Sequence, residues 1–542
     1  MRLASGIAAA ATLATALALS APPVRAQEPA SAKAPASAKK PNIVVIMGDD
    51  IGWYNTSLYN RGDMGYETPN IDRIGKEGGM FLSWYGQQSC TAGRAAFVTG
   101  QSPIRTGLTK VGLPGADLGL GPKDPSVGDV MKSLGYATAQ FGKNHLGDLN
   151  AHLPCVHGFD EFFGNLYHLN AEEEPENSDY PKDPAFKKRF GPRGVLHCRA
   201  TTTDDATTEP VYGKVGTQKI ENTGPLTVKR METIDDEFTD AAVGWMQKQA
   251  KGGKPFFLYY NSTRMHIFTH LKAASEGKTG LGLEADGMVE HDAHVGQILK
   301  AIDDLGVGND TIVVYTTDNG AEMMSWPDGG STPFRGEKAT NWEGGYRVPT
   351  LIRWPGVIKP GTVYNQFFSH EDFIPTFAGA AGNADIVAQC AKGCTLGGKS
   401  YKVHLDGYDL GPFFRGTSKE SPRREFLYWS DDGDLFAIRV LDWKITFIEQ
   451  YEQGLAIWEK ASTRLRAPNI YNLRTDPFER GTFSSWYPDY KAHRAFLVVP
   501  AQAIVAKWME SFKEFPIRQK PASFNLDDVM RKMEDAGGPG AN

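Results

Sequence analysis

The sequence predicts an α/β fold: a large, mostly parallel β-sheet with helices on both faces, and a smaller α+β C-terminal domain with an antiparallel sheet. Three observations predict it. Four short apolar segments each end in polar residues, as buried parallel strands do where they leave a core. Helix-like segments alternate with these strands. After about residue 421, closely spaced aromatic and β-branched segments replace that alternation, which is typical of antiparallel strands.

Polar residues follow each of the four predicted strands. They are Asp49 and Asp50 after 41–50, Lys143 and His145 after 136–147, Arg264 and His266 after 254–266, and Asp318 and Asn319 after 310–320. Ligands of open parallel sheets bind outside the carboxyl ends of the strands. We therefore expect one site to be formed by Asp49, Asp50, Lys143, His145, His266, Asp318 and Asn319.

The intervening segments 126–135 and 284–306 have the apolar spacing of helices. In the second, one predicted face is formed by Met288, His291 or Asp292, Val295, Ile298, Leu299 and Ile302. Residues of about 170–230 show little periodicity and are interpreted as an irregular insertion within a large α/β domain of residues 41–420. The C-terminal domain, 421–542, is expected to hold strands around the turn 431–434, an amphipathic helix over 501–515 and a flexible tail.

The N-terminus predicts export. Residues 1–26 combine a basic start, an apolar Ala/Leu run and a small-residue cleavage site, which is typical of a secretory signal peptide. Residues 27–40 resemble a disordered tether. Removing Arg2 and Arg25 with the signal leaves 56 basic against 64 acidic residues, a net charge of −8. We expect a periplasmic or secreted protein with no stable membrane anchor after cleavage, and the acidic balance argues against nucleic acid as a partner.

Export also affects how the five cysteines are interpreted, because an oxidising compartment favours disulfides. Cys390 and Cys394 flank a short turn, and Cys155 and Cys198 bracket the insertion, so we predict these two pairs. Cys90 is then left over. An unpaired thiol in an exported protein is buried, reactive or chemically altered.

The carboxylates and amide after the first and fourth strands form an oxygen-only ligand set. Asp49, Asp50, Asp318 and Asn319 suit a hard divalent ion, Ca²⁺ or Mg²⁺. The alternative for the adjacent Asp49 and Asp50 is a pair of helix caps or turn formers. Two neighbouring carboxylates repel each other unless a cation or basic groups compensate. The equivalent place of Asp318 and Asn319 after another strand favours the metal site.

Basic residues would surround this metal. They are Arg94, Lys143, His145, His266 and Lys338. So much positive charge suits an anionic ester, a sulfate or a phosphate. Cys90 precedes a predicted helix, whose N-terminal N–H groups lower a thiol pKa, so a cysteine nucleophile with a histidine base is one interpretation. A thiol beside a hard-metal site is nevertheless unexpected.

One motif accounts for that thiol. Cys90-Thr91-Ala92-Gly93-Arg94, followed by "TGQSPIRTGL", resembles the signature of the type I, formylglycine-dependent sulfatases. The segments "NIVVIMGDDIGW", "GKNHLG", "DTIVVYTTDNG" and "NIYNLRTDPFERG" resemble further blocks of that family in the family order, from about residue 41 to 480. The chain is therefore similar to arylsulfatases of the alkaline phosphatase superfamily. It departs from the common signature at Ala92 and Gly93, where Pro and Ser are frequent.

The resemblance implies a mechanism and a set of roles. A maturation enzyme would convert Cys90 to formylglycine, whose hydrate attacks the sulfur of a small-molecule aryl or related sulfate ester. The implied ligands of Ca²⁺, with Mg²⁺ as the less favoured ion, are Asp49, Asp50, Asp318, Asn319 and the modified Cys90. The implied catalytic residues are Arg94 and Lys143 for the hydrate, Lys143, His266 and Lys338 for the sulfate, His266 or Lys338 as acid, and His145 as base.

Three other functions stay open on the sequence. They are a phosphomonoester or phosphonate monoester hydrolase on the same scaffold, a carbohydrate sulfatase, and a binding protein that keeps the fold without turnover. Leaving-group recognition is expected from residues 165–230, the loop 323–333 and parts of the C-terminal domain. In that loop Met323, Met324 and Trp326 could form an apolar rim for an aryl group.

Overall fold

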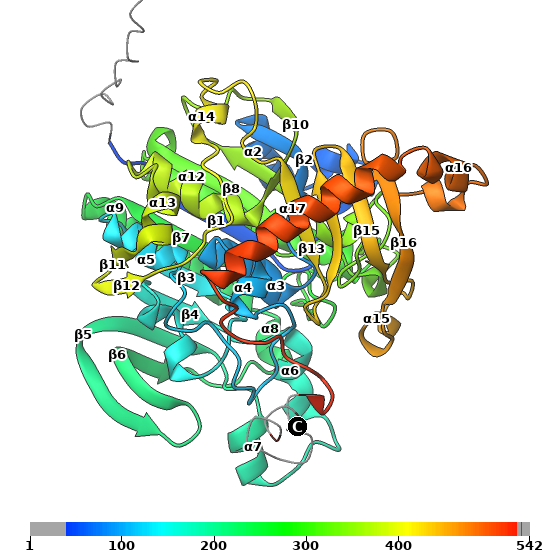
Figure 1. Cartoon of the computed structure of the whole chain (residues 1–542). Coiled ribbons are helices and arrows are strands. Elements are labelled where there is room, and N and C mark those ends of the chain that lie inside the picture. Colours follow the sequence, from blue (N-terminus) through cyan, green and yellow to red (C-terminus); the bar gives the residue numbers. More distant parts are fainter. Residues whose placement is uncertain (1–38, 528–529, 531–532, 534–542) are drawn as a thin grey trace, which may run out of the picture. The chain divides into compact units, whose positions relative to one another are not determined.

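The computed structural model describes residues 39–527, 530 and 533, and its largest element is a ten-stranded mixed sheet (Figure 1). The strands are, in spatial order, β10 (Thr362–Ser369), β2 (Gly79–Tyr85), β9 (Arg347–Arg353), β8 (Thr311–Thr317), β1 (Asn42–Gly48), β7 (Phe256–Asn261), β3 (Ala137–Gly142), β4 (Glu161–Gly164), β5 (Leu196–Glu209) and β6 (Gly213–Asn222). The four strands predicted from sequence form the contiguous, wholly parallel block β8-β1-β7-β3 at the centre.

Alternation along β1 divides the core into two layers. Ile43, Val45 and Met47 belong to one apolar cluster, while Val44 and Ile46 belong to another. Successive side chains of a strand point to opposite faces, so both faces of the sheet are covered by apolar packing. This confirms the predicted sheet with helices on both sides.

Different helices cover the two faces. Against Val44 and Ile46 pack α2 (Pro69–Lys76), α9 (Ile234–Lys251) and α10 (Leu283–Asp304). Against the other face pack α3 (Cys90–Thr99), α5 (Val127–Ser133), α12 (Phe373–Ala380) and α13 (Ile386–Lys392). The predicted helices 126–135 and 284–306 are thus α5 and α10, and the predicted apolar face of α10 is buried.

The insertion is more regular than its sequence indicated. Within 170–230 the long strand β5 and its neighbour β6 form an antiparallel hairpin that extends the main sheet beyond β4. The sequence of β5 shows little alternation of apolar and polar residues because the outer part of this strand is exposed on both faces. Its repeated threonines are β-branched and still favour extended backbone.

A second sheet follows in the C-terminal region, as predicted. It is the antiparallel meander β13 (Glu425–Trp429), β14 (Leu435–Val440), β15 (Trp443–Glu449) and β16 (Thr463–Asn472). The predicted helix 501–515 is α17 (Val498–Glu510), which lies across this sheet (Figure 1) with the rings of Trp508 and Trp429 5.6 Å apart.

The remaining α-helices and strands are short. They are α1 (Ser57–Asn60), α4 (Pro103–Thr106), α6 (Leu169–Glu173), α7 (Pro184–Phe190), α8 (Val228–Met231), α11 (Glu343–Tyr346), α14 (Gly411–Phe414), α15 (Ala456–Glu459), α16 (Tyr487–Ala492), β11 (Cys394–Leu396) and β12 (Lys399–Tyr401).

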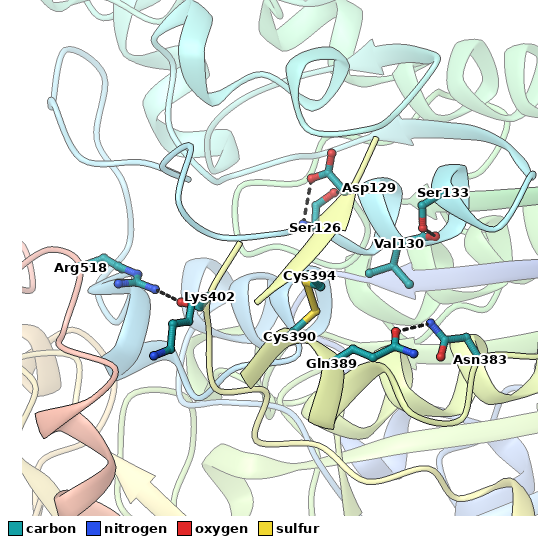
Figure 2. The surroundings of a disulfide bond; sticks show 10 residues. All are labelled: Ser126, Asp129, Val130, Ser133, Asn383, Gln389, Cys390, Cys394, Lys402 and Arg518. Carbon is teal, nitrogen blue, oxygen red and sulfur yellow. Dashed lines mark hydrogen bonds between the residues drawn. A yellow bond between two sulfur atoms is a disulfide. The ribbon is translucent and has the colours of Figure 1, made fainter. Parts of the chain in front are cut away.

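One of the two predicted disulfides is formed. Cys390 at the end of α13 is bonded to Cys394 at the start of β11 (Figure 2). The predicted Cys155–Cys198 bond is wrong: both are free, buried thiols in an apolar cluster with Phe162. Hydrogen bonds of the β4–β5–β6 ladder hold this region, so the cross-link expected to fasten an irregular insertion is not needed.

The predicted signal peptide, nearly all of the predicted tether and the end of the predicted C-terminal tail lie outside the described residues. Among the helices that are described, none combines the length and the apolar character that a membrane span requires.

Candidate active site

The carboxyl ends of β1 and β8 bring the predicted ligand residues together. Asp49 and Asp50 follow β1, and Asp318 and Asn319 follow β8, its parallel neighbour. The backbone N–H of Asp50 donates to Asp318 Oδ1 (3.2 Å), and Asn319 Nδ2 donates to Asp50 Oδ1 (2.7 Å). Ligand atoms of Asp49, Asp50, Cys90 and Asp318 all lie within 4.8 Å of one another, and all four residues are buried. The convergence expected for the residues after these two strands is confirmed.

Cys90 is the first residue of α3, whereas the sequence led us to expect the helix to follow this residue, from Ala95 on; the helix therefore begins five residues earlier than expected. Its Sγ lies 3.7 Å from Asp50 Oδ1. Burial and the Asp50 carboxylate raise the pKa of the Cys90 thiol well above its ordinary value. A neutral thiol is a poor nucleophile and a poor ligand for a hard ion.

Gly93 allows α3 to approach β8. A Cβ atom at this position would lie 1.9 Å from the backbone oxygen of Asp318. Such a contact is impossible without displacing the backbone of a predicted metal ligand. The departure from the common signature at Gly93 therefore matches the close packing between the helix and the end of the strand.

Arg94 holds two of the carboxylates. Its guanidinium donates to Asp318 Oδ2 from Nε (3.0 Å) and lies 3.3 Å from Asp49 Oδ1 through NH2, and the side chain is fully buried. NH1 donates to the carbonyl of Lys143 and to Asn261 Oδ1, 3.1 Å each. Because its donors are engaged by groups from β1, β3, β7 and β8, Arg94 is part of the framework of the site.

Two lysines complete the charge balance. Lys143 Nζ lies 2.6 Å from Asp49 Oδ2, and Lys338 Nζ lies 2.8 Å from Asp50 Oδ2. Lys338 also contacts Glu322 (3.2 Å), a buried residue that the sequence analysis did not single out. Burial raises the pKa of Glu322 despite this lysine. Around Cys90, three carboxylates thus face three cations: Asp49, Asp50 and Asp318 against Arg94, Lys143 and Lys338.

Three imidazoles line one side of the site. The ring of His168 lies 5.5 Å from that of His145 and 6.0 Å from that of His266. Burial, with the charge of nearby lysines, lowers the pKa of all three, that of His168 to about 3. All three are therefore neutral near pH 7. His168 was missed because it follows β4, a strand that the sequence did not predict.

The hydrogen bonds of two of these rings define their tautomers. His145 Nε2 lies 3.1 Å from the carbonyl of Gly112, which only accepts, so Nε2 carries the proton and Nδ1 has a free lone pair. His145 Nδ1 is buried without a partner. His168 Nδ1 accepts from the N–H of Ala171, which leaves its proton on Nε2. His266 Nε2 lies 3.9 Å from Asp50 Oδ2.

Arg264 does not belong to the site. It is fully buried and pairs with Asp235 (3.1 Å) and Glu290 (2.9 Å) behind the strand end. Carboxylates from α9 and α10 hold its guanidinium, so of the two basic residues that follow β7 only His266 lines the site.

A cavity of about 630 Å³ opens above these groups. Cys90, His168, His266, Glu322 and Lys338 form its floor and, with Asp49, Asp50, Arg94, Lys143, His145, Asp318 and Asn319, are called the inner site. The remaining lining residues, called the outer wall, are Val111, Leu113, Asn170, Glu174, Ile267, Phe268, Leu455, Trp458, Glu459, Ser523 and Phe524. Met323, Met324 and Trp326 are exposed but do not line it, so the rim predicted from them is formed by other residues. A cavity of about 700 Å³ beside α17 contains none of the predicted site residues.

The donor set fits a divalent cation. The three carboxylates are hard oxygen ligands, and Asn319 Oδ1 is a buried oxygen with no hydrogen-bond partner. Unpaired buried acceptors are rare in folded proteins, and a hard cation would satisfy this one. The residues present therefore form a candidate metal site.

Comparisons with known proteins agree with this geometry. A family model described as Sulfatase matches residues 41–383. The chain belongs to the sulfatase family. Arylsulfatase A of Homo sapiens is 33% identical over 459 residues, which cover 81% of this chain and 82% of that protein. Steryl-sulfatase of Mus musculus is 30% identical, over 77% and 70% of the two chains.

A solved structure supports the same fold. The PsFucS1 sulfatase from Pseudoalteromonas sp. superposes with a TM-score of 0.74 at 28% sequence identity, over 89% of this sulfatase and 92% of that chain. N-acetylgalactosamine-6-sulfatase of Mus musculus is 31% identical over 83% of each chain. The protein is a type I, arylsulfatase-like enzyme that hydrolyses sulfate esters.

Proposed function

We propose that this sulfatase cleaves an aryl or related sulfate ester with a formylglycine made from Cys90 as nucleophile and a bound calcium ion. The observation that carries the proposal is the position of Cys90. It lies at the base of the cavity, 3.7 Å from a carboxylate of an all-oxygen ligand set, where a thiol is chemically out of place. An aldehyde hydrate at this position would present a hard oxygen to the same set.

The charges favour an anionic substrate. Asp49, Asp50 and Asp318 are balanced by Arg94, Lys143 and Lys338. We propose that the three carboxylates, Asn319 Oδ1 and the modified residue 90 hold the ion, with Mg²⁺ as the alternative to Ca²⁺. When bound, the ion would supply polarisation of a sulfate oxygen. The resulting excess of positive charge in a buried site needs an anion, and a sulfate ester supplies one.

Each side chain of the inner site would have a separate role in the reaction. Lys143 and Lys338 would bind sulfate oxygens, and Arg94 would hold the carboxylate framework and the hydrated residue in register. A hydrate at residue 90 would supply one hydroxyl that attacks sulfur and a second whose deprotonation releases sulfate. His145 Nδ1, with its free lone pair, would accept that proton.

The departing alcohol or phenol would take its proton from Lys338, which is protonated, or from His266 once this neutral imidazole has taken up a proton. Both line the cavity floor and face Asp50 Oδ2, at 3.9 Å and 2.8 Å respectively. A positioned acid of this kind contributes about 10²- to 10⁴-fold to the rate.

The direct test is the chemistry of residue 90. The protein is produced in its exported form with a formylglycine-generating maturation enzyme, and the peptide that contains residue 90 is analysed by mass spectrometry and hydrazone formation. We expect an aldehyde, in proportion to the turnover of nitrophenyl sulfate. Full activity in a preparation that contains only alkylatable Cys90 thiol would overturn the proposed nucleophile.

A carbohydrate sulfate is the second candidate substrate, because relatives of similar identity include an N-acetylgalactosamine-6-sulfatase. A phosphomonoester is the alternative on the same scaffold. Assays with nitrophenyl sulfate and nitrophenyl phosphate separate sulfate ester hydrolysis from phosphate ester hydrolysis. A larger kcat/KM for the phosphate ester would contradict the proposal that a sulfate ester is the substrate.

We also propose that the protein is exported to the periplasm or secreted. The sequence of residues 1–26 supports this, as does the Cys390–Cys394 disulfide, which requires an oxidising compartment in most organisms. Fractionation of cells that produce the full chain, with the N-terminus of the mature protein determined, tests the proposal.

A further inference from the structure

The outer wall differs sharply in character from the inner site beneath it. Four of its apolar side chains are substantially exposed: Leu113 by 42%, Phe268 by 36%, Leu455 by 57% and Phe524 by 47%. Exposed apolar groups are common one at a time, but a cluster around the mouth of a catalytic cavity indicates a ligand surface. These residues come from four segments far apart in the chain, so the cluster is not a by-product of one amphipathic element.

The charged residues of the outer wall are all acidic. Glu174 and Glu459 line the cavity and are exposed. Among the described lining residues of the whole cavity, Lys338 is the only lysine or arginine, and it is paired on the floor with Asp50 and Glu322. A second anion on a bound substrate would therefore meet carboxylates without a compensating cation.

A basic side chain that packs against the wall, Lys110, is also neutralised. Lys110 is buried and lies 2.6 Å from Asp431 and 2.8 Å from Asp432. Its Nζ sits 4.6 Å from the ring centroid of Phe524, which belongs to the wall. The positive charge of Lys110 is thus used by its two carboxylate partners and is not offered to the cavity.

We propose that the outer wall restricts this sulfatase to sulfate monoesters whose leaving group is apolar and carries no second negative charge. The inference rests on the proposed function and specifies the substrate class of the same site. Aromatic and aliphatic side chains bind the body of the leaving group. Glu174 and Glu459 repel leaving groups with an additional sulfate or carboxylate, such as fragments of polyanionic glycans.

The test uses two aryl sulfates of matched shape. One is the sulfate ester of methyl para-hydroxybenzoate, whose leaving group is neutral, and the other is that of para-hydroxybenzoate, whose leaving group carries a carboxylate. The quantity compared is the ratio of kcat/KM for the neutral ester to that for the anionic ester. Intrinsic differences between the two phenols cancel when this ratio is compared between variants.

We expect the wild type to prefer the neutral ester. Glu174→Lys and Glu459→Lys should each lower the ratio by about 10-fold, because each reverses one charge close to the substrate carboxylate. Glu510→Lys, an equal charge change at an exposed residue of α17 that does not line the cavity, should leave the ratio unchanged. The change in the ratio should shrink at high salt, as electrostatic effects at exposed groups do.

The outcomes separate the two proposals. If neither ester is turned over by protein with a converted residue 90, the proposed function fails. If both are turned over and the two reversal variants keep the wild-type ratio, or if the wild type prefers the anionic ester, the inference about the outer wall fails. Glu174→Gln and Glu459→Gln, which should each lower the ratio less, replace any lysine variant that does not fold.

Discussion

The inner site and the outer wall of the same cavity are built in opposite ways. The inner site consists of buried charged and polar groups, most of which follow strands of one parallel block, and each carboxylate there has a cationic partner. The outer wall consists of partly exposed apolar side chains and unpaired carboxylates from loops and the C-terminal segment. The first arrangement suits one chemical step on one small group, and the second suits selection of what is attached to that group.

This contrast predicts how each layer responds to change. Buried paired charges are interdependent, so loss of one partner leaves another charge unsatisfied and costs several kcal/mol. Contacts of exposed apolar side chains are separate and each contributes about 1–2 kcal/mol. Substitutions in the inner site should therefore abolish turnover, whereas substitutions in the outer wall should shift substrate preference.

The largest effect is expected from Asp50→Asn. This change keeps the shape of the side chain but removes a carboxylate that lies next to Cys90, Lys338 and Asn319. We expect kcat/KM to fall about 10³-fold, equivalent to about 4 kcal/mol, and the stabilisation of the protein by added calcium to disappear. Activity assays and thermal unfolding with and without calcium measure both.

Asp183→Asn is the matched control for that substitution. Asp183 caps the short helix α7 through the N–H of Ala185, a role that asparagine also fills, and it does not line the cavity. It should keep both activity and the calcium response. A calcium-induced rise in Tm of the Asp50→Asn variant equal to that of the wild type would show that Asp50 is not a ligand.

Much of the inner site could be predicted from sequence because parallel strands place their carboxyl ends at one edge. Short motifs at Asp49, Lys143 and Asp318 were therefore enough to locate it. His168 was missed because it follows a short, partly polar strand, and Glu322 because its proximity to Lys338 arises from a loop that folds back. The outer wall could not be predicted at all, since residues such as Leu455 and Phe524 carry no local pattern that relates them.

The second prediction concerns the packing beneath the inner site. His370 is buried; Trp84 Nε1 donates to its Nδ1 (3.0 Å), and its Nε2 donates to the carbonyl of Thr317 (2.8 Å), next to Asp318. Burial lowers the pKa of His370 to about 4. The unfolded chain therefore binds a proton here below pH 6.5, whereas the folded protein does so only below about pH 4.

The stability contributed by neutral His370 is thus present above about pH 6.5 and is lost as the pH falls towards 4. We expect this residue to account for about 3 kcal/mol of the decrease in the free energy of unfolding over that interval. His370→Gln keeps a donor and an acceptor but does not titrate, so its unfolding free energy should decline less steeply in urea denaturation. Parallel pH profiles for the two proteins would contradict the assignment.

Gly93→Ala tests the close approach between α3 and β8. The new Cβ would lie 1.9 Å from the backbone oxygen of Asp318, which cannot rotate away as a side chain can. We expect a loss of about 1–3 kcal/mol of stability, together with reduced turnover because the ligand Asp318 is displaced. Chemical denaturation and kcat measurements on the same preparation check both effects.

Gly244→Ala is the control for that change. Gly244 lies in the middle of α9, where an added Cβ meets nothing within 4 Å. Alanine is the better helix former, so this variant should gain about 0.5–1 kcal/mol. If Gly93→Ala were as stable and as active as Gly244→Ala, the requirement for glycine in the signature of this chain would be refuted.

The smallest effect is expected in the outer wall, from Trp458→Ala. The indole lines the cavity at α15 and should bury roughly 50–60 Å² against an aryl leaving group, worth about 1.4 kcal/mol at 25 cal/mol per Å². We expect KM for nitrophenyl sulfate to rise about 10-fold with kcat nearly unchanged, because this contact is made equally in the ground state and the transition state. Trp486→Ala, a change at a 77% exposed indole that does not line the cavity, should alter neither constant. A fall in kcat without a change in KM would instead place Trp458 in the machinery of the chemical step, and the division between inner site and outer wall would have to be redrawn.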